Sequence, residues 1–140
     1  MDNKIKHLEM IQAVIQRMAN NSFQLKGWAV TLVGVMGALS TTRDDKGFFL
    51  LAFIPILAFW GLDSFYLQLE RKFTILYKNI TEKDDKGIDF DMDLRHIIVA
   101  DEDQRRLMFW NCVFSKSETW FYGSITVAVI ILVVVMRFFW

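Results

Sequence analysis

The sequence predicts a membrane protein built almost entirely of α-helices, with three transmembrane helices and a cytoplasmic domain. Of its 140 residues, 54% are hydrophobic, yet 23% are charged, and 16 basic residues balance 16 acidic ones. The two populations are segregated into blocks along the chain, whereas a soluble globular protein intersperses them. The blocks without charge are therefore the candidate membrane spans.

Three segments lack charge for long enough to be membrane spans. They cover residues 27–42, 47–62 and 119–136, and are 16, 16 and 18 residues long. At about 1.5 Å per residue such helices extend roughly 24–27 Å, slightly less than a hydrocarbon core of about 30 Å. Flanking aromatic and basic side chains complete short spans, and indoles favour the headgroup region. The tryptophans at or near the segment ends are Trp28, Trp60, Trp120 and Trp140.

Lysine and arginine predict the orientation, because they are enriched on the cytoplasmic side of membrane proteins. With the N-terminus inside, 13 basic residues face the cytoplasm and three face the opposite side. Those three are Arg43, Lys46 and Arg137. We therefore expect a cytoplasmic N-terminus and a C-terminus outside, after the third span in residues 119–140.

Heptad-like apolar patterns lie on the cytoplasmic side of the first hairpin. One runs through residues 62–80 and predicts that the second span continues as a stalk to about Ile80. The other predicts an amphipathic N-terminal helix, residues 1–26, that is continuous with the first span. Three spans cannot enclose an aqueous path alone, so a channel requires an oligomer. Both patterns offer apolar seams for such a homo-oligomer, which we expect to be a tetramer.

Asp63 directly follows the second span, and Lys26 directly precedes the first. In an antiparallel hairpin the two side chains lie at about the same depth. A carboxylate at the bilayer centre costs about 2.5–3.5 kcal/mol, and the cost is smaller at the interface beside a lysine. We therefore expect an interfacial ion pair of Lys26 and Asp63 where the helix leaves the membrane. The alternative is a pore-lining or proton-carrying role for Asp63.

One face of the first span carries a stripe of small residues. Its members are Gly27, Thr31, Gly34, Ala38 and Thr41. Small side chains let helix backbones approach closely in lipid, so this stripe predicts helix packing within one protomer or between protomers. The alternative is a pore face on which Thr31 and Thr41 offer hydroxyl groups to water.

Residues 63–118 form the predicted stalk and cytoplasmic domain, with nine basic and twelve acidic residues. In a symmetric oligomer each local basic cluster is repeated around the axis, where it can bind a polyanion. The candidate ligand-binding residues are Arg71, Lys72, Lys78, Arg105 and Arg106. The neighbouring rings of Phe109 and Trp110 can stack on bases. A solvated helix face is the alternative interpretation of each cluster.

The aspartates at positions 89, 91 and 93 have the spacing that opens an EF-hand loop. Leu94 and Ala100, however, stand where that loop needs Gly and Glu. Apolar residues alternate with the three acids, which predicts a half-buried strand or an extended segment. The sequence also contains no zinc motif, glycine-rich phosphate loop or nucleophile elbow. We therefore expect no metal site, no cofactor and no enzymatic activity.

Three stretches of the chain resemble a family of small bacterial three-span membrane proteins. They are residues 7–39, 59–77 and 113–135, and together they cover more than half the chain. The resemblance extends to membrane effectors of anti-phage defence, such as that of the Hailong system. It implies an ion channel in the bacterial inner membrane, held shut by DNA oligomers that a nucleotidyltransferase-like partner enzyme makes. Loss of the oligomer on infection would open the channel, depolarise the membrane and arrest or kill the cell.

The sequence and this resemblance together favour a homo-oligomeric ion channel gated by a cytoplasmic ligand. Its expected partners are the lipid bilayer, further copies of the same chain and a DNA oligomer. The main alternative is a non-conducting membrane anchor that recruits a cytosolic partner through an exposed apolar surface. A third possibility is an accessory subunit that modulates another membrane protein.

Overall fold

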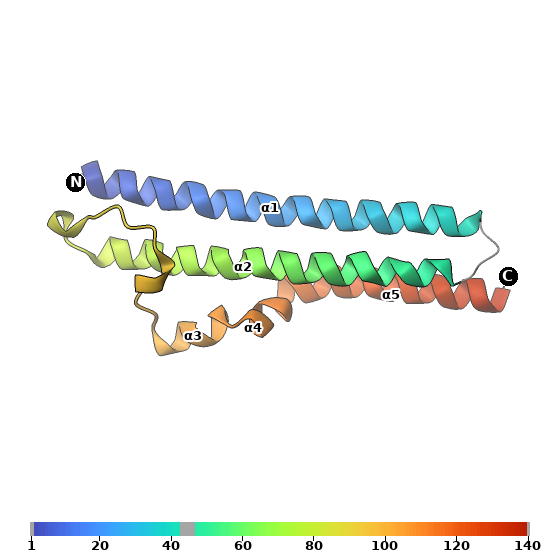
Figure 1. The fold of residues 1–140 in the computed structure, drawn as a ribbon. Helices are drawn as coiled ribbons and strands as arrows, with labels where there is room; N and C mark the ends of the chain where they lie inside the picture. Colours follow the sequence, from blue (N-terminus) through green and yellow to red (C-terminus); the bar gives the residue numbers. More distant parts are fainter. Residues whose placement is uncertain (1, 43–46, 140) are drawn as a thin grey trace. The chain divides into compact units, whose positions relative to one another are not determined.

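A computed structural model describes residues 2–42 and 47–139, and most of these residues are helical (Figure 1). In chain order the elements are α1 (Asp2–Thr41), η1 (Phe48–Ala52), α2 (Phe53–Glu82), η2 (Asp85–Gly87), η3 (Leu94–His96), α3 (Asp101–Leu107), α4 (Phe109–Val113) and α5 (Lys116–Phe139). The elements labelled η are short 3-10 helices. Three residues used in the sequence predictions lie outside the described ranges, namely Arg43, Lys46 and Trp140.

The chain divides into two compact units, and the long helices α1 and α2 contribute to both. Unit 1 comprises Met1–Ser22 and Phe65–Cys112, so it contains the N-terminal half of α1 and the region from late α2 through α4. Unit 2 comprises Phe23–Ser64 and Val113–Trp140, so it contains the rest of α1, the start of α2, and α5. Each unit has its own buried apolar cluster.

Unit 2 packs three helices around a small core. Its buried residues are Ala29, Phe49, Ala52, Ile56, Tyr122 and Val129. Ala29 comes from α1, and the others come from η1 with the start of α2 and from α5, where they recur at helical spacing. One stripe of each helix therefore faces the core, and the remaining surface of each helix faces outward.

Two helices in the described part of the chain are long and apolar enough to cross a membrane. They are Phe48–Glu82, which includes η1, and Lys116–Phe139, and they contain the predicted second and third spans. Helix α1, which contains the predicted first span, is not one of them. Seven of the 16 residues in 27–42 are Gly, Ser or Thr, and these residues lower the hydropathy of that segment.

Unit 1 contains the two heptad-like patterns, and they pack against each other. Ile11 of α1 is buried together with Leu76 and Ile80 of α2. Leu8, Ile15 and Phe73 extend this core, and Ile88, Met92, Leu94 and Ile97 cover it from the following segment. Residues of the two seams that the sequence offers for assembly thus pack against each other within one protomer.

The sequence predicted a short strand or an extended segment around the three aspartates, and the strand does not form: the described residues contain no strand. Phe90 has a φ of 54°, in the left-handed region, which interrupts any extended run. The backbone N–H two residues after each aspartate donates to that aspartate's Oδ1, at 3.2, 2.8 and 2.9 Å in turn. The alternating acids therefore form consecutive Asx turns, which bind the backbone donors that a strand would need.

Candidate functional site

A cluster of charged and polar side chains lies in unit 2, where its three helices meet. Lys26 comes from α1, Asp63 from α2, and Glu118 and Tyr122 from α5. The exposed fraction is 0% for Asp63 and Tyr122 and 1% for Glu118. The side chain of Lys26 retains 17% exposure. Two carboxylates are thus removed from water around one ammonium group, and we call these four residues the ion cluster.

The ammonium group of Lys26 connects the ion cluster. Its Nζ donates to Asp63 Oδ2 at 2.5 Å and to Glu118 Oε1 at 2.9 Å. The Tyr122 hydroxyl donates to the same Asp63 Oδ2 at 3.0 Å. The ring centroids of Phe121 and Tyr122 lie 5.7 and 5.9 Å from Nζ, within the range of cation–π attraction. This environment favours the charged form of the lysine.

The three charged residues meet because each directly adjoins an apolar segment. Lys26 precedes the first segment and Asp63 follows the second. An antiparallel hairpin therefore places the two side chains at a similar depth, where they are in contact. Glu118 directly precedes the third segment. Tyr122 is one helical turn beyond Glu118, so both side chains share a face of α5. The sequence analysis did not select Glu118 or Tyr122. Glu118 adjoins the third apolar segment as Lys26 adjoins the first, so a comparison of depths would have identified the glutamate.

Trp60 of α2 fixes α5 beside the ion cluster. Its indole Nε1 donates to the carbonyl oxygen of Val113 at 3.0 Å. Its ring stacks on Tyr122 with centroids 5.8 Å apart and an interplanar angle of 10°. From the sequence we expected the Trp60 indole at the membrane interface, and in the structure its N–H donates a hydrogen bond within unit 2. Trp28 and Trp120, by contrast, are 67% and 77% exposed.

The small-residue stripe of α1 faces away from the core of unit 2. All of its members are exposed: Gly27, Thr31, Gly34, Ala38 and Thr41. A Cβ atom added at Gly34 would meet no atom within 4 Å, whereas one at Gly37 would lie 3.2 Å from a ring carbon of Phe49. Gly37, which sequence reasoning did not select, is therefore the glycine that permits close packing inside the protomer. The small-residue stripe itself is on the exposed face of α1.

Three of the five candidate ligand-binding residues meet at one pocket of unit 1. Arg71, Lys78 and Arg106 line this pocket of about 330 Å³, together with the acidic Glu70 and Asp103. The Arg71 guanidinium also donates to the backbone carbonyl oxygen of Arg106 at 2.7 Å, which connects α2 to α3. The other two candidates, Lys72 and Arg105, are not among the lining residues. We call this the basic pocket.

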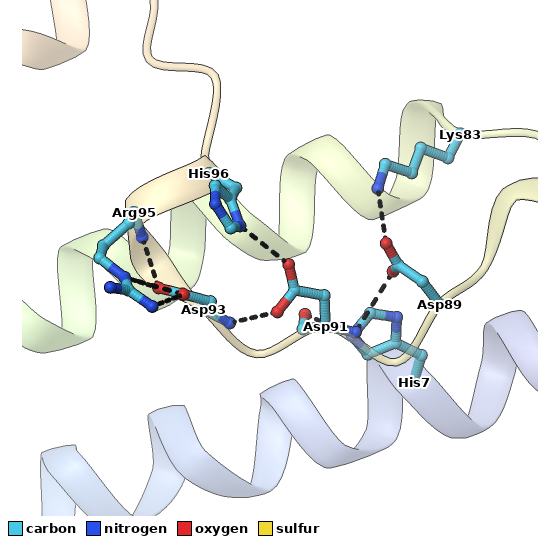
Figure 2. Close-up of polar contacts among 7 residues, drawn as sticks. All are labelled: His7, Lys83, Asp89, Asp91, Asp93, Arg95 and His96. Carbon is cyan, nitrogen blue, oxygen red and sulfur yellow. Dashed lines mark hydrogen bonds and ion pairs between the residues drawn. The ribbon is translucent and has the colours of Figure 1, made fainter.

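The acidic loop of unit 1, residues 89–96, is stabilised by local polar contacts (Figure 2). Arg95 contacts both carboxylate oxygens of Asp93, with Nε at 3.0 and 2.9 Å and Nη2 at 2.6 Å. The side-chain hydrogen bonds from Arg95, followed by its backbone N–H, lower the pKa of Asp93 to about 2. Lys83 lies 3.9 Å from the carboxylate of Asp89. These carboxylates are paired with basic groups and backbone donors.

Both histidines of the chain, His7 of α1 and His96 of the loop, contact Asp91 (Figure 2). His96 Nδ1 is 3.3 Å from Asp91 Oδ2, and His7 Nε2 is 3.1 Å from the Asp91 carbonyl oxygen. The His7 ring is buried and lies 5.4 Å from the ring of Phe90. Across the described ranges, no group of three or more His, Cys, Asp or Glu side chains could hold a metal ion. The contacts of the loop are those of a structural element.

Comparisons of this chain with protein-family models, curated proteins and solved structures give no match. The functional proposals therefore depend on the residues of this chain and on their geometry.

Proposed function

We propose that the chain is one subunit of a homo-oligomeric ion channel in the bacterial inner membrane, gated by a cytoplasmic polyanion. The observation that carries this proposal is the outward apolar surface of unit 2. Only 11% of the most apolar part of α5 is buried, and side chains such as Ile131 and Phe138 are 56% and 77% exposed. The core helix of a soluble protein buries such residues, whereas a membrane helix exposes them to lipid.

The proposed topology has three spans, with residues 27–42 of α1 as the first. The apolar residues Val30 and Val35 on this segment are 51% and 50% exposed, and the indole of Trp28 is also exposed. The excess of basic residues before the first span and between the second and third supports a cytoplasmic N-terminus and an outside C-terminus. Unit 1 would then lie on the cytoplasmic side.

The small-residue stripe of α1 supports contacts between protomers in the membrane. Its members are exposed in the single chain, and a Cβ atom added at Gly27 or Gly34 would meet no atom within 4 Å. The hydroxyls of Thr31 and Thr41 donate to backbone carbonyls at 2.9 and 2.7 Å, and their oxygens remain able to accept hydrogen bonds from water. In the proposed tetramer this face lies at the subunit contact or along the pore.

The basic pocket is the proposed binding site for the gating ligand. Its three basic and two acidic side chains give each pocket a modest net positive charge. Repetition around a symmetry axis would turn four such pockets into a site for a polyanion. By the resemblance to defence effectors, we propose a DNA oligomer made by a nucleotidyltransferase-like enzyme as the ligand, and membrane depolarisation as the outcome of its loss.

Ion flux from liposomes that contain the purified protein tests the channel, with the mass in detergent measured in parallel. Gly34→Leu and Gly37→Leu form a matched pair. Gly34→Leu should leave the protomer folded and reduce both the oligomer mass and the flux, because the site is open in the single chain. Gly37→Leu should destabilise the protomer itself, because even its Cβ would lie 3.2 Å from a ring carbon of Phe49, so the ring would have to shift. Sealed vesicles formed by a stable wild-type monomer would contradict the proposal.

The ligand is tested by adding single-stranded DNA oligomers of defined length to the same liposomes. We expect the oligomers to reduce the flux of the wild type, and Lys78→Glu with Arg106→Glu to abolish that reduction while membrane insertion is unchanged. Lys86→Glu in η2 is the control, since this exposed residue is outside the basic pocket. Equal DNA binding by the pocket variant and the control would refute this ligand site.

A non-conducting membrane anchor is the second candidate, and exposed apolar residues on unit 1 favour it. Ile98, Met108 and Trp110 are 80%, 56% and 66% exposed. Such residues suit the docking of a cytosolic protein. The anchor predicts sealed vesicles with and without DNA, and also with the basic-pocket variants. The same flux measurements therefore distinguish the two candidates.

A further inference from the structure

We infer that the ion cluster of unit 2 is a proton-binding site, which holds one proton on Glu118 and thereby keeps α5 attached to α1 and α2. This inference goes beyond the proposed channel, because it concerns the charge of three packed helices and does not require that the protein conducts ions. It rests on the number of charges in the cluster, on their burial and on the hydrogen bonds of each carboxylate.

The ion cluster has one ammonium group for two carboxyl groups, so its charges balance only if one carboxyl group holds a proton. Lys26 supplies one ammonium group, while Asp63 and Glu118 supply two carboxyl groups that are 0% and 1% exposed. If both carboxyl groups were ionised, the buried cluster would carry an uncompensated negative charge. Such a charge is costly to bury, and two neighbouring carboxylates relieve the cost by keeping one proton.

The hydrogen bonds assign the proton to Glu118. Asp63 Oδ2 accepts from both Lys26 Nζ and the Tyr122 hydroxyl, at 2.5 and 3.0 Å. Two donors on one oxygen stabilise the ionised form of that carboxylate. Glu118 accepts from Lys26 through Oε1, but its buried Oε2 has no hydrogen-bond partner among the described residues. A proton on Oε2 removes the charge from the carboxyl group that has fewer donors.

Every helix packed against Glu118 contributes a group that responds to this proton. Lys26 from α1 is attracted to an ionised Glu118, and Asp63 from α2 repels it. On α5 itself, Tyr122 is occupied by its bond to Asp63. When Glu118 ionises, the proton passes to water and the two carboxylates compete for one ammonium group. The repulsion acts on the first turn of α5, since the helix begins at Lys116.

Infrared spectroscopy of the full-length protein in lipid tests the site directly. A protonated carboxyl group has a C=O stretching band that an ionised carboxylate lacks. We expect the wild type to show this band at neutral pH and to lose it on alkaline titration. Glu118→Gln should lack the band. Asp63→Asn, which removes the competing charge, should lose the band as well, because a lone Glu118 beside Lys26 ionises.

The pH dependence of unfolding in detergent is the second measurement, and its sign follows from proton binding. If the folded state holds a proton that the unfolded glutamate releases, stability falls as pH rises until the folded site also loses its proton. We expect this fall in the wild type and a flat profile for Glu118→Gln over the same pH range. Glu9→Gln, on an exposed part of α1, should retain the wild-type slope.

Either measurement can overturn the inference. The absence of a carboxylic-acid band in the wild type at neutral pH excludes the proton, whether or not any variant folds. A band that persists in Glu118→Gln places the proton elsewhere. Stability that depends on sodium or potassium concentration, with no such band, would identify a small cation on Glu118 in place of the proton. Because none of these readouts involves ion flux, failure of the channel proposal would leave this test intact.

Discussion

Acidic side chains are used in opposite ways in the two units of this molecule. In unit 1 the aspartate side chains of the acidic loop contact polar groups two to six residues away along the chain, and the Arg95 side chain is 85% exposed. In unit 2 the ion cluster joins residues that are 37, 59 and 92 positions apart, and its carboxyl groups are buried. The loop contains backbone turns, whereas the cluster connects three helices.

The difference shows that the same residue types have different energetic weight in the two units. Water screens the charges of the acidic loop, so any one of its pairs contributes little. The ion cluster has lost most of its water, so each of its groups depends on the others for compensation. Removing one partner should therefore have a large effect in unit 2 and a small effect in unit 1.

The largest expected effect is that of Lys26→Met. This change leaves Asp63 and Glu118 buried without a cation, and removing one partner of a buried ion pair costs about 3–5 kcal/mol. We expect a loss of this size in the free energy of unfolding, measured by denaturant titration in detergent. The control is Lys83→Met in unit 1, where the lysine side chain is 44% exposed and lies 3.9 Å from Asp89. Equal losses in the two variants would contradict the distinction between the units.

A double-mutant cycle of Lys26→Gln and Asp63→Asn measures the central pair of the ion cluster. Contacting residues in one network couple by about 0.5–3 kcal/mol, whereas independent sites give additive losses. We expect coupling in the upper part of this range, because the two atoms are 2.5 Å apart and Asp63 is fully buried. The same free energies of unfolding provide the measurement, and additive losses would mean that the pair does not act as a unit.

Tyr122→Phe should have an intermediate effect, because it removes one donor from Asp63 and keeps the ring that stacks on Trp60. A hydrogen bond to a charged group contributes about 1.5–3 kcal/mol. We expect a loss within this range in denaturant unfolding. Tyr77→Phe is the matched control, because Tyr77 is half-buried beside the core of unit 1. A larger loss for Tyr77→Phe than for Tyr122→Phe would contradict the expectation that the Tyr122 hydroxyl contributes more to stability.

The sequence predicted the helices well, because long apolar and amphipathic periods determine them locally. It predicted that the second helix continues to about Ile80, and α2 ends at Glu82, whereas only two of the three predicted spans lie in helices apolar enough to cross a membrane. The similar depth predicted for Lys26 and Asp63 agrees with their contact in the structure. The strand was wrong because alternation of acids and apolar residues fits both a strand and consecutive Asx turns, and only hydrogen-bond partners distinguish them.

The rest of the candidate site depends on the tertiary path of the chain. The position of Glu118 before the third segment predicts a depth similar to that of Lys26 and Asp63, but its contact with Lys26 also requires that α5 packs beside the hairpin. The basic residues show the same limit. Arg71 and Arg106 are 35 positions apart, and the fold of unit 1 decides that they line one pocket while Lys72 does not.

The smallest expected effect is at Asp93 in the acidic loop, and its pH dependence is confined to acid. Its pKa is lowered from the ordinary 3.8 to about 2, first by the hydrogen bonds of the Arg95 side chain. A carboxylate with a lowered folded-state pKa stabilises the fold above its unfolded pKa and loses that contribution as pH falls toward the folded value. The stability difference between wild type and Asp93→Asn should therefore be constant above about pH 5, decrease as pH falls, and be lost only at about pH 1, below both pKa values.

Arg95→Gln separates this local effect from the ion cluster, because it removes the guanidinium and leaves the backbone N–H that closes the turn. In a carbon-13 titration of the Asp93 carboxyl group, this variant should move the midpoint upward, toward the ordinary value. The alkaline change predicted for Glu118 should stay as in the wild type, since the two sites titrate for different reasons. An unmoved Asp93 midpoint in Arg95→Gln would mean that the backbone donor alone holds the charge. Exposed pairs in unit 1 would then matter even less than their short distances suggest.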